Sequence, residues 1–114
     1  MERALIVQKV WSDKIFDLND PKTWEMRSTK TSIRGTIGII EAGSGLIVGS
    51  VEIVACLQHP LEYPAFFINE HKVENLSLLN KWCYAWILSN AKRFDKPIPY
   101  THPKGAVIWV KINL

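Results

Sequence analysis

The sequence predicts an α+β fold, a small mixed β-barrel of about five or six strands flanked by two or more helices. Three observations indicate this fold. Runs rich in β-branched and apolar residues recur along the chain, a glycine-containing segment separates two of them, and two other stretches carry apolar residues at helical spacing. The 114 residues, 47% hydrophobic and 22% charged, are typical of one globular domain, which we place at 1–114.

The first two elements are predicted to be a strand and a helix. Residues 3–8, RALIVQ, are rich in β-branched and apolar side chains, as a strand would be. Residues 11–20, WSDKIFDLND, are predicted to form a helix with Ser12 as its N-cap. Its apolar residues recur at helical spacing, at Trp11, Ile15 and Leu18. An Asn-Asp-Pro sequence then ends it.

Residues 22–28, KTWEMRS, are predicted to form the next strand, in which neighbouring side chains point to opposite sides. Trp24 and Met26 share one side, which we expect to be buried. Glu25 and Arg27 share the other side, and Lys22 stands at the corner where the chain can turn it inward. Two interpretations stay open from the residues alone: a surface ion pair beside a solvated lysine, or a pocket lined by the three charged side chains.

The central segment, 35–57, is predicted to be a β-hairpin. Two β-rich runs flank EAGSG, whose glycines permit the positive φ angles of a tight turn. The turn has neither the phosphate-loop pattern nor the dinucleotide-binding context, so these nucleotide folds are excluded. The backbone N–H groups of Gly43 and Ser44 remain candidates for a phosphate contact.

The last third of the chain is predicted to hold one helix and at least one strand. Residues 70–82 carry apolar residues at helical spacing, at Val73, Leu76, Leu79 and Trp82. Residues 83–94 fit a strand or a helix. Three prolines in 97–103 argue against regular structure there, and 105–114 is predicted to be a strand.

Charge is unevenly distributed along the chain. Residues 1–34 hold seven Lys/Arg against five acids and residues 69–114 hold seven against three, whereas residues 35–68 hold none against three. A basic face built from the two ends is compatible with an anionic ligand such as nucleic acid, and equally with an ordinary mixed surface.

Other features point to a cytoplasmic protein without a bound metal or cofactor. Acidic residues and glycines interrupt the most hydrophobic region, so no membrane span is expected, and the apolar run near the start is too short for a signal peptide. Cys56 and Cys83 lack metal-binding spacing and are predicted to be buried free thiols. The three histidines are scattered, and His71 with Glu74 alone would not make a metal site.

The segment DPKTWEMRS resembles the GxKxxExR signature of the ASCH domain, a family of the PUA-like superfamily. Lys22, Glu25 and Arg27 occupy three of its positions, while Asp20 replaces the leading glycine. The similarity continues through the hairpin and through NAKRFDKPIPY and GAVIWV, so it covers nearly the whole chain. It implies a PUA-like barrel with a cleft walled by the motif, and a strand at 84–94.

The resemblance also implies a range of activities. Such families are associated with RNA binding, some ASCH proteins hydrolyse N4-acylated cytidine, and others are linked to RNA cleavage. In the amidohydrolase branch a lysine works with a threonine and a later glutamate. Lys22 matches the lysine and Glu74 the glutamate, but Glu25 stands at the threonine position and Thr23 lies on the opposite strand face.

The site residues expected on this basis serve binding, hydrolysis or both. Arg27 suits a phosphate or a base edge, and Glu25 can accept from an exocyclic amine. Trp24 and Trp86 are candidates for stacking a base, although a tryptophan in a domain of this size more often packs in the core. We expect Tyr100 at the rim, and assign Trp82 and Trp109 to packing. If the site is hydrolytic, Glu25 would activate a water and the Lys22 ammonium would stabilise the oxyanion.

Two functions therefore stay open, with RNA or a modified nucleoside as the partner in both. One is a binding module, and the alternative is a small hydrolase, either an amidohydrolase acting on N4-acylated cytidine or a ribonuclease. No Ser-His-Asp or Cys-His arrangement is recognisable in the sequence. A protein that only binds other proteins is a third and less favoured hypothesis.

Overall fold

The computed structural model describes residues 1–59, 62–63 and 65–114. One six-stranded sheet is present, in the order β2-β5-β4-β3-β1-β6. β1 and β3 pair in parallel and the other neighbours are antiparallel. The strands are β1 (Arg3–Val7), β2 (Trp24–Arg27), β3 (Gly35–Glu41), β4 (Leu46–Gln58), β5 (Tyr84–Pro99) and β6 (Trp109–Lys111). The predicted α+β fold of about six strands is confirmed.

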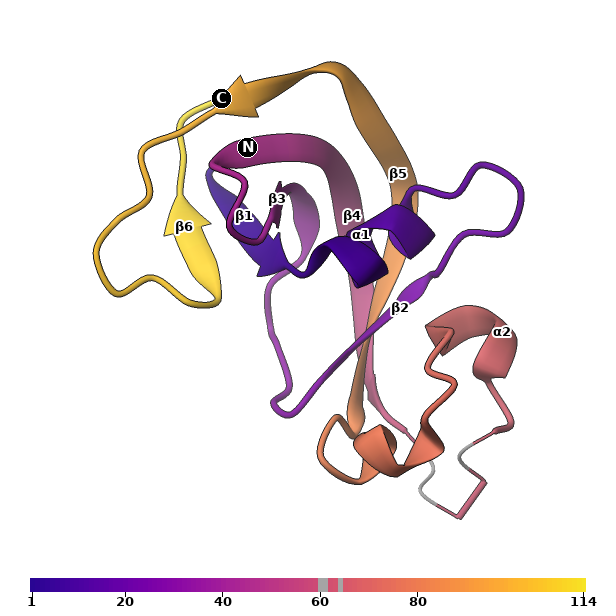
Figure 1. Cartoon of the computed structure of the whole chain (residues 1–114). Helices are drawn as coiled ribbons and strands as arrows, with labels where there is room; N and C mark the ends of the chain where they lie inside the picture. Colours follow the sequence, from indigo (N-terminus) through magenta and orange to yellow (C-terminus); the bar gives the residue numbers. More distant parts are fainter. Residues whose placement is uncertain (60–61, 64) are drawn as a thin grey trace.

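The sheet curls into a half-barrel because its two longest strands bend. β4 and β5 arch over β1 and β3 in Figure 1, and three register shifts between them mark the bends. At Gly49 the strands approach so closely that a Cβ atom would lie 2.5 Å from the Lys92 carbonyl oxygen and from the Phe16 ring. Glycine is therefore required at this bend.

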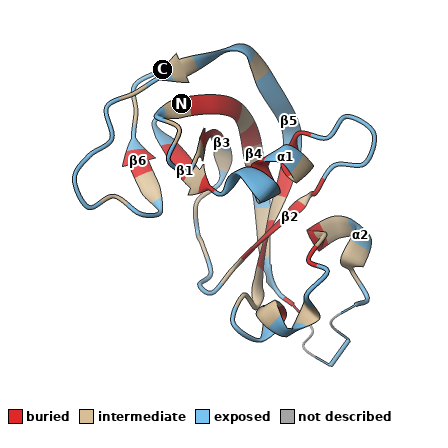
Figure 2. Ribbon diagram, in the orientation of Figure 1, coloured by how far each residue is buried: buried red, intermediate tan, exposed pale blue. Residues whose placement is uncertain are grey.

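The buried apolar residues form three clusters, and Figure 2 shows buried positions along the strands of the sheet. The main core lies inside the curl and joins Ile15 and Phe16 to strands β1, β3, β4 and β5. The second core lies where β2 and β5 meet the segment after β4, and contains Trp24, Met26, Val73, Leu79 and Ala85. Trp11 packs against both.

The first helix is shorter than predicted and begins earlier. α1 spans Lys9–Ile15, so Ser12 is an interior residue whose hydroxyl donates to the Lys9 carbonyl oxygen (3.2 Å), not an N-cap. The Asp17 carboxylate accepts hydrogen bonds from the N–H groups of the residues two and three positions later, Asn19 (2.9 Å) and Asp20 (3.2 Å). This local turn competes with the helix. Leu18 is consequently 97% exposed.

The prediction of one helix over residues 70–82 is wrong. The structure has a single turn, α2 (Ile68–His71), and a separate 3₁₀ helix, η1 (Leu76–Asn80). Lys72 adopts a left-handed conformation, with φ of 59°, and the His71 ring accepts from the Val73 N–H at Nδ1. Both features end a helix at this point, although Val73 and Leu79 still reach the second core.

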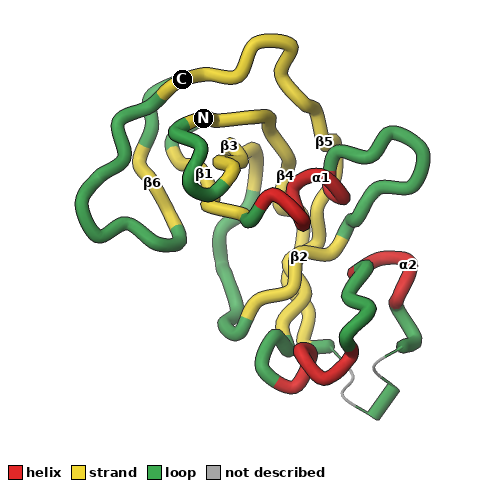
Figure 3. The backbone as a smooth tube through the Cα atoms, viewed as in Figure 1, coloured by secondary structure: helices red, strands yellow, loops and turns green. Residues whose placement is uncertain are grey.

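The prolines near the C-terminus do not exclude regular structure, contrary to the sequence-based expectation. β5 continues through Pro97 and Pro99, as the long yellow stretch in Figure 3 shows. β2 pairs with β5 only over Tyr84–Ile87, so the later part of β5 has a free edge, where a residue without an N–H is tolerated. The final strand is confined to β6, because residues 105–108 form turns and bends.

Other predictions are confirmed. β1 lies within the predicted first strand, β5 includes residues 84–94, for which the resemblance implied a strand, and the β3–β4 turn has positive φ at Gly43 (77°) and Gly45 (72°). Cys56 and Cys83 are free thiols, as predicted, but the prediction that they are buried is wrong, because both are half-buried. Within the described parts of the chain, no helix is long and apolar enough to cross a membrane.

Candidate functional site

Lys22 is held at the entrance to β2 by backbone hydrogen bonds to both helices. Its N–H donates to the Lys14 carbonyl oxygen of α1 (2.8 Å), and the Thr23 N–H donates to the Glu70 carbonyl oxygen of α2 (3.0 Å). The loop between α1 and β2 is therefore fixed at its end, which turns the lysine side chain inward. This side chain is only 1% exposed.

The Lys22 ammonium group lies between a backbone carbonyl, a carboxylate and an indole ring. Its Nζ donates to the His71 carbonyl oxygen, lies 4.0 Å from Glu25 Oε1 and sits 5.1 Å from the centroid of the Trp11 ring. The His71 ring supports this carbonyl by accepting from the Val73 N–H (2.9 Å). The break between α2 and η1 thus leaves the His71 carbonyl oxygen to accept a hydrogen bond from Lys22.

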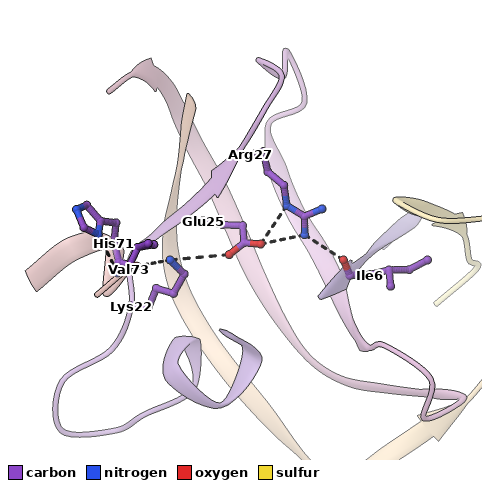
Figure 4. A network of polar contacts seen from close by, with 6 residues as sticks. All are labelled: Ile6, Lys22, Glu25, Arg27, His71 and Val73. Atoms are coloured by element: carbon purple, nitrogen blue, oxygen red, sulfur yellow. Dashed lines mark hydrogen bonds and ion pairs between the residues drawn. The ribbon is translucent and has the colours of Figure 1, made fainter. Parts of the chain in front are cut away.

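Glu25 and Arg27 continue the polar row across the curled sheet, as Figure 4 shows. Glu25 Oε2 accepts from Arg27 Nε (3.0 Å) and lies 2.9 Å from Nη2. Arg27 Nη2 also donates to the Ile6 carbonyl oxygen (3.0 Å). Since β2 is one edge of the sheet and β1 lies next to the other edge, this bond closes part of the gap between the two ends of the half-barrel.

These three side chains line one pocket of about 270 Å³. Lys22 and Glu25 are buried, while the Arg27 side chain is 21% exposed. The remaining lining residues come from β1, α1 and its N-cap, β2, the β3–β4 turn and the segments before β5 and β6: Ile6, Gln8, Trp11, Met26, Ala42, Val73, Trp82 and Val107. The pocket therefore combines two cations and one carboxylate with an apolar, partly aromatic wall.

Burial alters the acid–base chemistry of the lysine. Removal from water disfavours the ammonium form and lowers the pKa of Lys22 to about 8, although the nearby Glu25 carboxylate partly opposes this shift. The amine and ammonium forms therefore interconvert near neutral pH, and the group can act either as a cation or as a proton acceptor.

The structure brings together some of the predicted site residues and separates others. Lys22, Glu25 and Arg27 share the pocket, which favours the pocket interpretation over a solvated surface pair. Trp24 does not line it and packs on Phe67, with ring centroids 4.5 Å apart. Glu74, Gly43, Ser44 and Tyr100 are also not among the lining residues; Glu74 is exposed, and the Tyr100 hydroxyl pairs with His102 (2.8 Å).

Trp86 is committed to packing on the main core. Its indole N–H donates to the Thr29 carbonyl oxygen (2.9 Å), and its ring stacks on Trp109 at an angle of 11°. The Arg27 guanidinium carbon lies 5.6 Å from the centroid of the same ring, so Trp86 packs against the arginine of the pocket. Neither Trp86 nor Trp109 lines the pocket.

Sequence reasoning missed several residues of the site. Trp11 and Trp82 were assigned to a helix stripe and to packing, yet both line the pocket. The carbonyl acceptors at Ile6 and His71 carry no signal in the sequence, because any residue type offers one. Among the described residues, no three His, Cys, Asp or Glu side chains gather as ligands for a metal ion.

Comparison with known proteins identifies the family. The model of the ASCH domain family matches residues 5–98. The crystal structure of ASCH from Zymomonas mobilis is similar in fold, with a TM-score of 0.71 and 13% identity, covering 98% of this chain and 87% of that chain. Two mutants of that protein give similar matches at 13% identity over 98% of this chain. The match covers 88% of the serine-to-alanine mutant chain, with a TM-score of 0.71, and 90% of the tyrosine-to-phenylalanine mutant chain, with a TM-score of 0.72.

No curated protein sequence matches the chain. At 13% identity the Zymomonas mobilis structures establish the shared fold alone. The family match spans most of the chain and includes the strand that carries Glu25 and Arg27. On this evidence the chain belongs to the ASCH domain family, which has a PUA-like fold.

Proposed function

We propose that this ASCH domain binds a nucleoside, either a free modified nucleoside or one nucleotide of an RNA strand, in the pocket of Lys22, Glu25 and Arg27. The observation that carries the proposal is the burial of two opposite charges, Lys22 and Glu25, in the lining of a pocket. Even when paired, buried ions often contribute less stability than apolar residues of similar volume, so a purely structural strand gains little from them.

The chemistry of the pocket suits a nucleoside. Arg27 donates through Nε and Nη2 to protein acceptors, which leaves Nη1 for a ligand oxygen. Glu25 Oε1 is free of the arginine and can accept from an exocyclic amine. A volume of about 270 Å³ is near the lower end of small-molecule sites, which favours one nucleoside over a longer segment of RNA.

The binding test uses isothermal titration calorimetry with N4-acetylcytidine, cytidine and a short single-stranded RNA. Lys22→Ala and Arg27→Ala should each weaken binding, and for the RNA should also reduce its salt dependence, because fewer counterions are released. Lys96→Ala, an exposed cation of β5 outside the pocket, is the matched control. Unchanged binding by both folded pocket variants would contradict the proposal.

Hydrolysis of N4-acylated cytidine is the second candidate function, and the position of Lys22 beside Glu25 favours it. Water would add to the acyl carbonyl, Glu25 would accept its proton, and the Lys22 ammonium would stabilise the oxyanion. Glu25 would then give this proton to N4 as the C–N bond breaks, which releases the carboxylic acid and cytidine. Glu74 has no part in this scheme because it is exposed and outside the pocket.

Turnover distinguishes binding from hydrolysis. Release of acetate from N4-acetylcytidine by wild type, lost in Lys22→Ala and in Glu25→Gln, would establish the hydrolase. Cleavage of the RNA, tested in the same way, would indicate the ribonuclease alternative. Binding without turnover of either substrate would leave the binding module as the function.

A further inference from the structure

The pocket has two chemically different ends. At the Lys22 end the wall is formed by Trp11, Trp82 and Val73. At the Arg27 end it is formed by Ile6, whose carbonyl accepts from the guanidinium, with Ala42 and Val107 near it. Glu25 lies between the two ends (Figure 4).

The aromatic end is shaped as a corner. The rings of Trp11 and Trp82 lie with centroids 6.0 Å apart and planes at 85°, so the two surfaces meet almost at a right angle. The Lys22 ammonium group lies over Trp11, 5.1 Å from the ring centroid. A planar ligand resting against Trp82 would therefore meet Trp11 at one border and come close to the lysine.

The other tryptophans are not available to a ligand in this pocket. Trp24 packs on Phe67 in the second core, and Trp86 is buried between Arg27 and Trp109. Trp11 and Trp82 are half-buried and line the pocket. Stacking on an aromatic face is the common way in which proteins hold an unpaired base, because every base offers a π surface.

We propose that Trp82 is the stacking platform for the base, that Trp11 sets its orientation, and that the sugar and any 5′-phosphate point toward Arg27. This inference rests on the proposed function and adds the direction in which the ligand enters. The arginine end suits an anionic group, since guanidinium forms strong hydrogen bonds with phosphate oxygens. The aromatic end suits the uncharged, planar base.

The test measures the affinity for N4-acetylcytidine by calorimetry in wild type, Trp82→Leu, Trp82→Phe and Trp109→Leu. Trp82→Leu should weaken binding by about tenfold or more, as expected when a stacking aromatic is removed, while Trp82→Phe retains most of the affinity. Trp109→Leu removes a half-buried tryptophan outside the pocket and should bind as wild type does.

The orientation has its own measurement. N4-acetylcytidine 5′-monophosphate should bind wild type more tightly than the nucleoside does. This advantage should disappear in Arg27→Ala and persist in Trp82→Leu. If the phosphate gives no advantage, or keeps it in Arg27→Ala, the proposed orientation is wrong.

The outcomes separate this inference from the proposed function. If Lys22→Ala abolishes binding while folded Trp82→Leu binds as tightly as wild type, the stacking role is wrong and the pocket assignment stands. If wild type binds none of the probes, both are wrong. Should Trp82→Leu fail to fold, quenching of tryptophan emission by N4-acetylcytidine decides. The quenching should be reduced in Trp82→Phe, in which Trp11 is the remaining tryptophan among the lining residues, and undiminished quenching would overturn the inference.

Discussion

The two sides of β2 are both shielded from water, but by different chemistry. On one side Trp24, 8% exposed, packs in an apolar cluster with Val73 and Leu79. On the other side Glu25, 4% exposed, lies between two cations. A strand that served only the fold would place its polar side in water. The apolar side contributes stability, whereas the charged side lines the pocket that we propose as the ligand site.

The energetic consequence is opposite on the two sides. Burial of the Trp24 side stabilises the fold through apolar area removed from water. Burial of Lys22 lowers its pKa from 10.5 to about 8, which corresponds to about 3 kcal/mol of preference for the neutral form relative to water. At neutral pH the protein must therefore offset the penalty of holding this ammonium group.

The largest expected effect is on the apolar side. Trp24→Ala should lower the free energy of unfolding by about 3–5 kcal/mol, because it removes a large buried ring and leaves a cavity. Urea unfolding measures the change, with Trp24→Phe as a milder control. A loss below about 1 kcal/mol would mean that the second core does not depend on this residue.

On the charged side, Glu25→Ala should destabilise the protein by about 3 kcal/mol, since it removes the carboxylate that two buried or half-buried cations share. Glu25→Gln keeps the shape and one acceptor oxygen, and should lose less. The same urea experiment compares the two. Equal stability of Glu25→Ala and wild type would show that water satisfies both cations.

Lys22→Met should change stability in the other direction. Methionine has a similar length without the charge, so the penalty disappears, while one hydrogen bond to the His71 carbonyl is lost. We expect a gain of about 1–2 kcal/mol in the free energy of unfolding at pH 7, from these two opposing effects. Destabilisation by more than about 1 kcal/mol would contradict this account.

The pH dependence of that difference follows from the pKa of the lysine. Between pH 8 and 10.5 the unfolded chain keeps the Lys22 proton and the folded chain loses it, so wild type gains stability relative to Lys22→Met as pH rises. The difference should therefore shift in favour of wild type across this range. A difference that does not vary between pH 7 and 10.5 would show that Lys22 keeps its ordinary pKa.

The smallest effect concerns His59, which lies beside Trp24 with ring centroids 6.3 Å apart. Burial lowers its pKa below 6.5, and its two ring nitrogens have no hydrogen-bond partner among the described residues. The unfolded chain then binds the proton more readily, so stability is present above pH 6.5 and declines as pH falls below it. His59→Leu should reduce this loss of stability, measured as the fall in the thermal unfolding midpoint between pH 7 and 5. A loss of stability equal to that of wild type would show that other groups cause it.

The sequence predicted the charged trio and the alternation of β2 because both depend on local spacing. It did not predict that the Glu25 side would be closed, since closure depends on the carbonyl groups of Ile6 and His71, which come from distant parts of the chain. Trp82 was assigned to packing for a similar reason. An aromatic residue at helical spacing has the same pattern whether it faces a core or a pocket.

The errors in the fold also arose where tertiary contacts or side chains override periodicity. Asp17 ends α1 before Leu18, and His71 with Lys72 interrupts the helix expected over 70–82. Pro97 and Pro99 remain in a strand because the neighbouring strand β2 is short, a fact of sheet order that local composition does not contain. By contrast, the β3–β4 hairpin was predictable because turn glycines and strand periodicity agree.

The most direct test of the central claim, that the buried charged row is a ligand site, is the calorimetric titration of N4-acetylcytidine into wild type and Lys22→Met at pH 7. Because Lys22→Met is expected to be at least as stable as wild type, a loss of binding cannot be attributed to unfolding. We predict saturable binding by wild type and none by the variant. Equal binding by both proteins, or no binding by wild type, would contradict the account.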